Sequence, residues 1–351
     1  MNKPLIYDLD YPHLMEILQS WGEPTFRTQQ IWKGIYQSLW QNSEEFTNIP
    51  KRLREKLGAH FSFNHLRPVT TSNSTDGETQ KILFELPDGR WIETVRMQYS
   101  NRHTLCISTQ SGCAMGCTFC ATGQMGFGRN LSSGEIVEQV LFYVRKLAEE
   151  GNRISNIVLM GMGEPFHNYE NVMEAIACLN HPEGLKLGAR RFTISTVGLV
   201  PAIRRFAQEN SQINLAVSLH AADDELRSSM LPVNKRYPIA DLMAALRDYV
   251  ALTHRRVTFE WALIEGVNDT PEQANRLADL LHGLLTHVNV IPLNPTGGFH
   301  GKATNRDQAR HFQAILESRG IPCTIRLRRG IDIQAGCGQL ASRQNSNSAI
   351  H

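Results

Sequence analysis

Four of the seven cysteines in this chain of 351 residues fall within the fifteen-residue segment CISTQSGCAMGCTFC. Cys113, Cys117 and Cys120 have the spacing C-x3-C-x2-C, and Gly112 and Gly116 each precede one of them. Three thiolates on one loop can converge on a single inorganic centre, and glycine helps the backbone fold around it. The odd cysteine count and the chain length argue against a disulfide-stapled secreted scaffold. The spacing therefore predicts a metal or cluster site.

Several interpretations compete for this loop. A structural zinc ion needs four protein ligands that fill its coordination shell, usually from two C-x2-C pairs, and the sequence has no second pair. An iron–sulfur cluster with four cysteine ligands needs one more thiolate. A 4Fe-4S cluster with three protein ligands would leave one iron open to a small molecule that bears amino and carboxylate groups. The plain alternative is three buried thiols, since free cysteine packs as a small hydrophobe, but a polar, glycine-rich loop suits ligation better.

Two further cysteines call for an explanation. Cys106 lies seven residues before Cys113, and Cys337 lies between two glycines near the C-terminus, in AGCGQ. Flanking glycines free the backbone to move, so Cys337 is a candidate nucleophile. Sequence distance does not preclude a pair of Cys106 with Cys337, but residue types alone leave ordinary thiols as the alternative.

The composition is that of a globular enzyme. Lys and Arg total 36 against 34 Asp and Glu, hydrophobic residues make up 41%, and mean hydropathy is −0.30. A disordered chain would have few apolar residues and a strong charge bias. No run approaches the roughly 18 apolar residues of a membrane span, and the N-terminus MNKPLIYDLDYPHL lacks the features of a secretory signal. We therefore expect a cytoplasmic protein with no membrane partner and two or three structural units.

Short apolar runs alternate with longer amphipathic stretches over most of the chain. This alternation predicts an α/β fold with a parallel sheet curled into a partial barrel of about six strand–helix units. A capping box, Ser132 with Glu135, opens the first helix. The expected strands are 104–108, 156–160, 191–196, 213–218, 257–263, 288–292 and 323–327, and the expected helices are 133–149, 169–178, 200–208, 239–252, 270–285 and 306–318.

Polar residues recur where the expected strands end, which is where barrels of this kind bind ligands. The cysteine loop follows the first strand, GMGE with Gly163 and Glu164 the second, Ser195 the third, Ser218, Leu219 and His220 the fourth, and Asn294 the sixth. A phosphate loop is the alternative for GMGEP, but the motif lacks the third glycine and the lysine of such loops. Each residue alone is a weak signal, because it could simply satisfy local backbone or form part of the wall. Their order at successive strand ends indicates one ligand site.

The patterns divide the chain into four parts. We expect a helical accessory domain at 1–70, a linker and β-hairpin at 71–100, the barrel at 101–331 and a C-terminal segment with a polar tail at 332–351. The hairpin is indicated by alternating strands around the turn PDG, and the linker by a stretch rich in Ser, Thr, Asn and Asp near 70–77. Residues 1–60 carry seven bases and seven acids, so their charge does not distinguish a binding domain from a unit that only packs on the barrel.

Two segments concentrate positive charge in an otherwise nearly neutral chain. Residues 186–205 contain five bases and no acid, and residues 302–329 contain seven bases against Asp307 and Glu317. Such blocks can hold phosphates. A solvated face is the alternative, because charge runs often serve only solubility.

The segment CISTQSGCAMGCTFCATGQMGFGRNLSSGEIVEQV resembles the radical S-adenosylmethionine (SAM) superfamily and, more specifically, its RlmN family of RNA methyltransferases. Phe119, just before the last cysteine, is part of the superfamily resemblance. The similarity continues through GMGEPFHNYENV, STVGLVPAI, SLHAADDELR, NVIPLNP and RRGIDIQAGCGQL, from about Glu93 to Leu340. The N-terminal part resembles the family mainly in GEPTFRTQQIWKGIY, where it implies an RNA-binding unit similar to a helix–hairpin–helix module.

The resemblance implies a reaction and its cofactors. The reaction is methylation of carbon 2 of an adenosine at the peptidyl-transferase centre of 23S rRNA and of the adenosine 3′ of the anticodon in tRNA. Cys113, Cys117 and Cys120 would hold one 4Fe-4S cluster with an open iron, and two SAM molecules would be used per turnover. The resemblance also implies an electron donor such as flavodoxin or ferredoxin, and we expect the chain to be a monomer.

Single residues acquire roles from the same resemblance. The positions that match SAM-contacting motifs are Gly163, Glu164, Ser195, Ser218, Leu219, His220 and Asn294. Cys337 matches the cysteine that becomes S-methylated, and Cys106 matches the cysteine that later forms a disulfide with it. Glu93 matches the proton acceptor proposed for the family. The two basic segments become candidate contacts for RNA phosphates.

Three other functions stay open. An enzyme of the related Cfr type would methylate carbon 8 of the same rRNA adenosine with the same set of cysteines, although GQMGFGRNLSSGEI looks closer to the carbon-2 enzymes. A non-catalytic RNA-binding protein would hold a structural metal and would not cleave SAM. A radical SAM enzyme that acts on a small molecule would leave the two extra cysteines and the basic segments unexplained.

Overall fold

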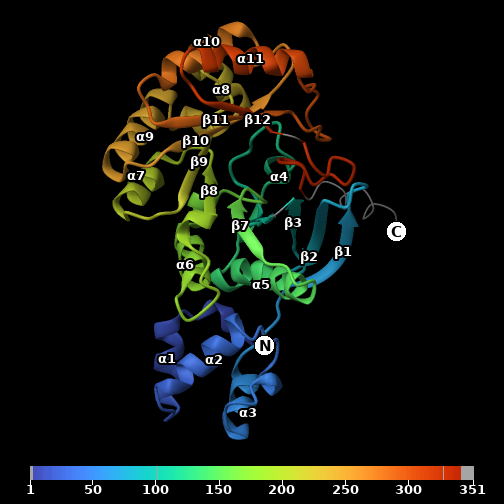
Figure 1. Cartoon of the computed structure of the whole chain (residues 1–351), viewed down its shortest axis with the longest axis vertical. Coiled ribbons are helices and arrows are strands. Elements are labelled where there is room, and N and C mark those ends of the chain that lie inside the picture. Colours follow the sequence, from blue (N-terminus) through green and yellow to red (C-terminus); the bar gives the residue numbers. More distant parts are fainter. Residues whose placement is uncertain (1–2, 101, 327, 341–351) are drawn as a thin grey trace.

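The computed structural model describes residues 3–100, 102–326 and 328–340. A curved sheet forms the body of the protein, helices cover its outer side, and a small helical unit is attached below it (Figure 1). The segment that carries Cys337 follows the last strand and passes between the two edges of the sheet (Figure 1).

One mixed sheet has ten strands in the order β1-β2-β3-β4-β7-β8-β9-β10-β11-β12. Strands β1 to β4 pair antiparallel, and from β4 onward each strand pairs parallel with the next. Because β1 and β12 are edges, the barrel is open. The strands are β1 Arg67–Asn73, β2 Thr79–Glu85, β3 Trp91–Tyr99, β4 Arg102–Cys106, β7 Ile154–Leu159, β8 Phe192–Thr196, β9 Asn214–Ser218, β10 Val257–Leu263, β11 Thr286–Pro292 and β12 Cys323–Ile325.

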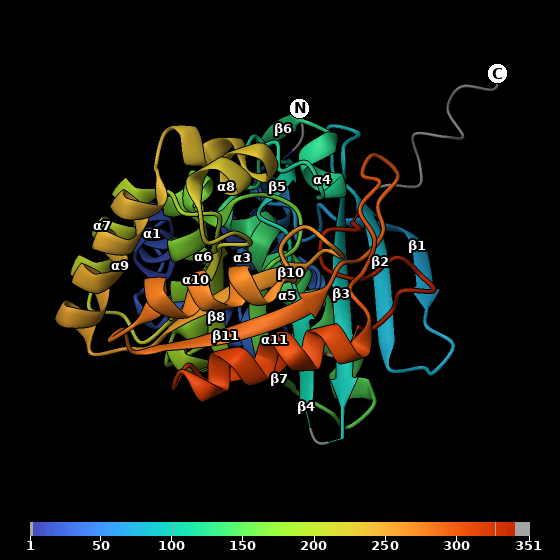
Figure 2. The ribbon, with the colours of Figure 1, turned by 90° about the horizontal axis from the view of Figure 1, so that it is seen from above.

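Six helices connect the parallel strands and lie along the outer side of the sheet (Figure 2). They are α5 Ser133–Glu149, α6 Tyr169–Asn180, α7 Val200–Gln208, α9 Ile239–Thr253, α10 Pro271–Leu281 and α11 Arg306–Ser318. Helix α5 starts at the expected capping box, in which Ser132 and Glu135 exchange side-chain and backbone hydrogen bonds. The predicted α/β partial barrel of six strand–helix units is confirmed. No helix in the described ranges is long and apolar enough to cross a membrane.

The sequence patterns missed several short elements. The polar stretch near 70–77, expected as a linker, forms most of β1 and the turn into β2. Strand β1 is exposed along nearly its whole length, and its structure depends on pairing with β2. Its sequence therefore lacks the alternation of apolar and polar residues that would predict a strand. The others are the hairpin β5 Gln110–Gly112 with β6 Phe127–Asn130, the helices α4 Ala121–Gln124 and α8 Asp224–Met230, and the 3-10 helices η1 Ile6–Asp8, η2 Ser43–Glu45, η3 Pro165–Asn168, η4 Ala189–Arg191 and η5 Pro232–Lys235.

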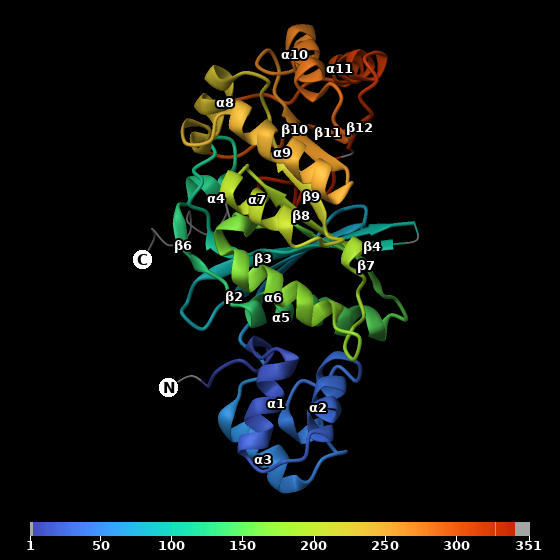
Figure 3. The same ribbon diagram turned by 90° about the vertical axis from the view of Figure 1, so that its left-hand side faces the viewer.

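The N-terminal unit consists of α1 Tyr11–Ser20, α2 Phe26–Tyr36 and α3 Lys51–His60, and it lies beneath α5 and α6 (Figure 3). Its junction with the barrel is polar as well as apolar. The Glu138 carboxylate on α5 accepts the backbone N–H groups of His65 and Leu66 at 2.9 to 3.1 Å. His181, just after α6, stacks on Tyr11 at 4.8 Å between ring centroids. These contacts fix the unit against the barrel.

Candidate functional site

The three closely spaced cysteines lie on the loop between β4 and α5. The hairpin of β5 and β6 closes this loop, and the backbone N–H of Cys113 donates to the carbonyl of Gly126 at 2.8 Å. Gly112 has a φ of +78°, and a Cβ there would collide with the Gly126 carbonyl. A Cβ on Gly123 would lie 2.9 Å from both the N and the O of Cys117. Both positions therefore need glycine for the loop to close.

The three thiols influence one another. Cys117 is buried, and Cys113 and Cys120 are half-buried. Burial raises the pKa of Cys113 to about 12, and nearby Glu164 and Cys120 raise it as well. Burial also raises the pKa of Cys117 well above its usual range, with further contributions from the other two thiols. Since only a thiolate ligates metal, the positive charge of a metal centre is what would keep these groups ionised.

The donor set suits a cluster better than a single ion. Across the described residues, no three His, Cys, Asp or Glu side chains converge tightly enough to hold one metal ion. A zinc ion would draw its thiolate ligands to about 2.3 Å. The irons of a cubic cluster occupy separate corners and accept thiolates that do not meet at one point. Three thiols that influence one another on a glycine-shaped loop, without converging on one point, are compatible with a 4Fe-4S cluster.

Glu164 lies just past β7, and backbone groups hold it in place. Its Oε1 accepts the N–H of Phe166 at 3.0 Å, and its Oε2 accepts the N–H of Val197 at 2.8 Å. Burial raises the pKa of Glu164 to about 7. Gly163 has a φ of +102°, and a Cβ there would lie 2.5 Å from the Cβ of Gln110. The GMGE turn thus presents one fixed carboxylate beside the cysteine loop.

The ends of β8 and β9 meet at a buried arginine that the sequence analysis missed. Ser195 and Ser218 are half-buried at these ends. Leu219 is fully buried, and its backbone N–H donates to the carbonyl of Glu260 at 3.1 Å, so it belongs to the wall. Arg227 of α8 donates to the carbonyls of Leu219 at 3.1 Å and Val197 at 2.7 Å. Arg227 lies within the quoted motif SLHAADDELR, but a lone arginine on a short helix gives no signal that it is buried.

His220 forms part of the wall. It has a φ of +61°, and its Nδ1 accepts the N–H of Ala262 at 2.9 Å, which leaves the ring proton on Nε2. Burial and nearby Arg227 lower the pKa of His220 to about 3, so the ring is neutral. Its ring packs edge-on against Phe119 of the cysteine loop at 4.9 Å between centroids. The structure therefore supports the wall interpretation, with the backbone of His220 turned by its left-handed conformation.

Asn294 lies just past β11 and contacts the C-terminal segment. Its Nδ2 donates to the carbonyl of Cys337 at 3.1 Å. Its Oδ1 is buried and accepts no hydrogen bond from the described residues, so it can accept one from a ligand. Ala121, next to Cys120, donates its N–H to the carbonyl of Gly338 at 2.7 Å. The segment with Cys337 is thus attached both to a strand end and to the cysteine loop.

Cys106 and Cys337 are brought together from distant parts of the sequence, and both are free thiols. Burial raises the pKa of Cys106 to about 12, and Cys337 contributes to that increase, which places the two thiols near each other. Cys337 is open to solvent, yet protein surrounds it on most sides. That crowding raises the pKa of Cys337 to about 12, and Cys120 and Glu260 raise it further. Cys337 therefore lies near Cys106 and also near Cys120 of the cysteine loop.

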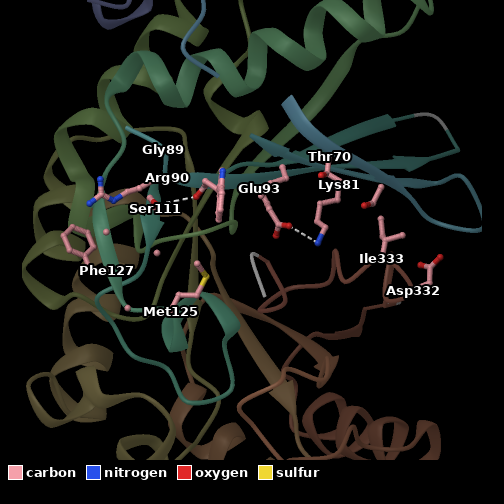
Figure 4. Close-up of a pocket in the computed structure, with 16 residues that line it drawn as sticks. Thr70, Lys81, Gly89, Arg90, Glu93, Ser111, Met125, Phe127, Asp332 and Ile333 are labelled. Atoms are coloured by element: carbon pink, nitrogen blue, oxygen red, sulfur yellow. Dashed lines mark hydrogen bonds and ion pairs between the residues drawn. The ribbon is translucent and has the colours of Figure 1, made fainter. Parts of the chain in front are cut away.

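Glu93 lines a pocket of about 530 Å³ between strands β1 to β3 and the cysteine loop (Figure 4). Its nearly buried carboxylate pairs with Lys81 of β2, with 2.9 Å between Oε1 and Nζ. The exposed side chains of Met125 and Phe127 line the pocket on the cysteine-loop side. Cys106 lies opposite Val95 in the β3–β4 pair, so Cys106 and Glu93 share one face of the sheet.

The basic segments are only partly available for phosphates. Arg190 and Arg191 lie just before β8, at the amino end of the strand and away from the site at its carboxyl end. Carboxylates of the chain pair with Arg205, Arg310, Arg319, Arg326 and Arg329. The structure therefore does not bring the first segment to the site, and much of the second serves internal ion pairs.

Comparisons with known proteins cover nearly the whole chain. Residues 107–280 match the model of the radical SAM superfamily, and residues 5–62 match the ribosomal RNA large subunit methyltransferase N-terminal domain. The chain is 50% identical to the probable dual-specificity RNA methyltransferase RlmN of Chloroflexus aurantiacus, over 98% of this chain and 94% of the relative. It is 48% identical to the dual-specificity RNA methyltransferase RlmN 1 of Myxococcus xanthus, over 95% and 93%.

A solved structure gives the same result. The crystal structure of a radical SAM methyltransferase from Sphaerobacter thermophilus superimposes with a TM-score of 0.94 at 50% identity. The match covers 97% of this chain and 99% of the other. The similarity therefore includes the N-terminal helices, the open barrel and the C-terminal segment.

Proposed function

This chain belongs to the RlmN family of radical SAM RNA methyltransferases, and from that premise we propose that it methylates carbon 2 of adenosine in RNA. The proposed targets are an adenosine at the peptidyl-transferase centre of 23S rRNA and the adenosine 3′ of the anticodon in tRNA. The observation that carries the proposal is that Cys337 lies near both Cys106 and Cys120 of the cysteine loop, while Glu93 shares a sheet face with Cys106. Methylation of such RNA would take place in the cytoplasm.

Carbon 2 of adenine explains why two reactive thiols are needed. This carbon lies between two ring nitrogens and is electron-poor, so it does not attack the electrophilic methyl group of SAM. A carbon radical, by contrast, can add to it. Under this proposal Cys113, Cys117 and Cys120 hold a 4Fe-4S cluster, which supplies the electron that splits SAM into methionine and a deoxyadenosyl radical. Gly163, Glu164, Ser195, Ser218, Leu219, His220 and Asn294 line the place for SAM.

Cys337 would carry the methyl group. Its sulfur first loses a proton and displaces the methyl group from one SAM molecule. After the radical from a second SAM removes a hydrogen atom from that methyl group, the methylene carbon on Cys337 adds to carbon 2 of adenine. The hydrogen on carbon 2 then leaves, its proton to Glu93 and its electron to a one-electron acceptor. This order uses two SAM molecules per methyl group transferred.

Cys106 would release the product. Its thiolate attacks the sulfur of Cys337, the bond between that sulfur and the methylene carbon breaks, and the carbon takes up a proton to become the methyl group. The two cysteines are left as a disulfide, which an external reductant must reduce before the next turnover. A flavodoxin or ferredoxin would supply the electrons, and the chain would work as a monomer.

RNA must present its target base unstacked, since the pocket lies inside the barrel mouth. The N-terminal helical unit is the proposed accessory RNA-binding domain, supported by its match to the family's N-terminal domain. The proposed phosphate contacts of the second basic block are exposed Arg328 and Arg326, whose ion pair with Glu260 is long at 3.8 Å. Charge reversal at both should weaken RNA binding and reduce its salt dependence. Unchanged affinity and salt dependence would count against this surface.

The test is anaerobic reconstitution with iron and sulfide, followed by labelled SAM with rRNA and tRNA fragments. We expect brown protein, deoxyadenosine, and RNA whose added methyl maps to carbon 2 by mass spectrometry and NMR. A methyl at carbon 8 would instead indicate Cfr-type chemistry, and colourless zinc protein without deoxyadenosine would remove the radical mechanism. With Cys106→Ala, RNA should stay covalently tethered to the protein. Free methylated RNA at the normal rate from that variant would refute the role of Cys106.

A further inference from the structure

Lys81 lines the pocket beside Glu93 (Figure 4). Its Nζ is 2.9 Å from Oε1 of Glu93 and 3.2 Å from the carbonyl oxygen of Gln334. Both side chains of the ion pair are more than nine-tenths buried, at 9% and 7% exposure. Lysine is almost never buried to this degree unless it is paired, because its ammonium group loses hydration. The burial of Lys81 therefore depends on these two partners.

Strand register places the reactive groups on the same face as Lys81. Lys81 of β2 lies opposite Val95 of β3, and Val95 lies opposite Cys106 of β4. Residues opposite each other in a sheet point to the same face, and so do residues two apart on one strand. Lys81 and Cys106 thus lie in one row across three strands, and Glu93 points the same way one step along β3.

The second partner belongs to the segment that carries Cys337. Gln334 lies three residues before Cys337 and has a φ of +52°, so the chain turns there. The next residue, Ala335, donates its N–H to the carbonyl of Gly330 at 2.8 Å. The ammonium group of Lys81 is therefore a bridge between the strand face with Glu93 and Cys106 and the segment with Cys337.

We propose that Lys81 is a positioning residue that fixes the Glu93 carboxylate and the Cys337 segment relative to each other. This inference rests on the proposed function, in which a proton moves from carbon 2 to Glu93 while the methylene carbon on Cys337 is bonded to the same atom. Both groups must then reach one carbon of the substrate together. A single ammonium group bonded to both limits their relative movement, whereas separate anchors would let them drift apart.

The test compares Lys81→Met with a control on helix α5, which packs on the other face of β2. Lys146→Met removes another lysine, whose Nζ donates to the side chain of neighbouring Gln80 at 2.9 Å, and Gln80 points to the other face of β2. With Lys81→Met we expect deoxyadenosine formation within about threefold of wild type but at least about tenfold less methylated RNA, since radical formation does not need the bridge. Lys81→Arg, which keeps the charge, should restore part of the coupling. Lys146→Met should behave as wild type.

A second readout follows the segment directly, without turnover. We expect alkylation of Cys337 by iodoacetamide, measured by peptide mass spectrometry against buried Cys178, to rise severalfold in Lys81→Met. Glu93→Gln should leave the rate low, because Lys81 still bonds the Gln334 carbonyl. The double variant Lys81→Met with Glu93→Gln removes both charges of this ion pair together, so we expect it to fold while losing the bridge, and its alkylation rate should again be high.

Two results would overturn the inference. One is equal alkylation of Cys337 in the double variant and in Glu93→Gln, and the other is normal coupling of deoxyadenosine to methylated RNA in Lys81→Met. Failure of the proposed function looks different. In that case the wild-type chain itself would methylate no RNA, and the alkylation rates would still decide whether Lys81 holds the segment.

Discussion

The cysteine loop with its neighbouring strand ends and the segment with Cys337 face each other across one pocket, but they are built in different ways. On the first side, Gly112 and Gly163 occupy positions where a Cβ would collide with neighbouring atoms, and Glu164 is buried with backbone hydrogen bonds to both oxygens. On the second side, Cys337 is exposed and lies between two glycines, and hydrogen bonds from Lys81 and Asn294 are among the contacts that hold the segment around it.

This difference matches what each side has to do under the proposed function. A cofactor that is split into a radical must be held still, because a small displacement would expose the radical to other reactions. A thiol that collects a methyl group, delivers it and then pairs with Cys106 must take several positions. We call the cysteine loop with its strand ends the fixed side, because close packing holds it. We call the segment with Cys337 the moving side, because hydrogen bonds that can break help to hold it. Substitutions on the two sides should accordingly fail in different ways.

Gly163→Ala should have the largest effect. The new Cβ would lie 2.5 Å from the Cβ and 2.8 Å from the N of Gln110, and a φ of +102° is strained for alanine. A distortion of about 3 kcal/mol at the strand end would lower SAM cleavage roughly 100-fold. The measurement is deoxyadenosine release by reconstituted protein. Gly297→Ala, where nothing lies within 4 Å of a new Cβ, is the control and should stay close to wild type.

Gly336→Ala tests the moving side and should cost less. Its Cβ would lie 2.6 Å from Nδ2 of Asn294 and 2.8 Å from Oε1 of Gln339, and both are ends of side chains that can shift. We expect a loss of about tenfold in RNA methylation, equivalent to about 1.4 kcal/mol, with deoxyadenosine formation nearly unchanged. An equal loss of methylated RNA and of deoxyadenosine would show that the Cys337 segment also affects SAM cleavage.

The free energy of unfolding should depend on pH in opposite directions for a carboxyl group on helix α5 and one on the Cys337 segment. Burial raises the pKa of Glu138, on the helix that follows the cysteine loop, to about 7 from its usual 4.5. The folded state then holds a proton that the unfolded state releases, so stability is full below about pH 4.5 and falls as pH rises through 7. The expected loss is roughly 3 kcal/mol at most. Thermal unfolding at pH 5.5 and 8 measures it.

Glu138→Gln should make the loss of stability between pH 5.5 and 8 smaller. Part of the loss should remain, because the raised pKa of Glu164 acts in the same direction. An unchanged slope in the variant would mean that Glu138 is ionised in the folded protein. On the moving side, hydrogen bonds from the Thr75 N–H and hydroxyl lower the pKa of Asp332. That contact is therefore present above the usual carboxyl pKa of 3.8 and weakens only as pH falls through the lowered value.

Asp332→Ala should give the smallest effect. The carboxylate accepts two hydrogen bonds from Thr75 at 2.7 and 2.8 Å, but both residues are at the surface, where such contacts contribute little. We expect alkylation of Cys337 to rise about twofold at most, and RNA methylation to change less than that. An effect as large as that of Gly336→Ala would instead make this surface contact a main anchor of the segment.

Most of the barrel was predictable because each of its elements repeats one local pattern. Helices from α5 to α11 that connect the parallel strands begin within a residue of the predicted positions, since apolar periodicity and caps mark them. Strand β1 was not predictable, because its partner β2 rather than its own side chains makes it a strand. The same limit applies to α8, which has only seven residues.

The candidate site was predictable where the residue type itself carries the chemistry. Three cysteines at fixed spacing indicate ligation, and the structure places them on one loop after β4. Lys81 and Arg227 escaped notice because their importance comes from burial and partners contributed by distant segments. The closeness of Cys106 to Cys337 likewise depends on how the last strand returns the chain to the first edge. Only the folded chain brings such pairs together.

Strand β1 is an exposed edge of the sheet, and two of its features protect that edge from pairing with another copy of the chain. Its register shifts between Pro68 and Thr70, which leaves Val69 as a bulge, and Val69 is 41% exposed. A straight, exposed strand offers free backbone groups to another copy of the chain, whereas a proline lacks the N–H donor and a bulge breaks the ladder. Removing both would turn this edge into a template for aggregation while leaving every reactive group in place.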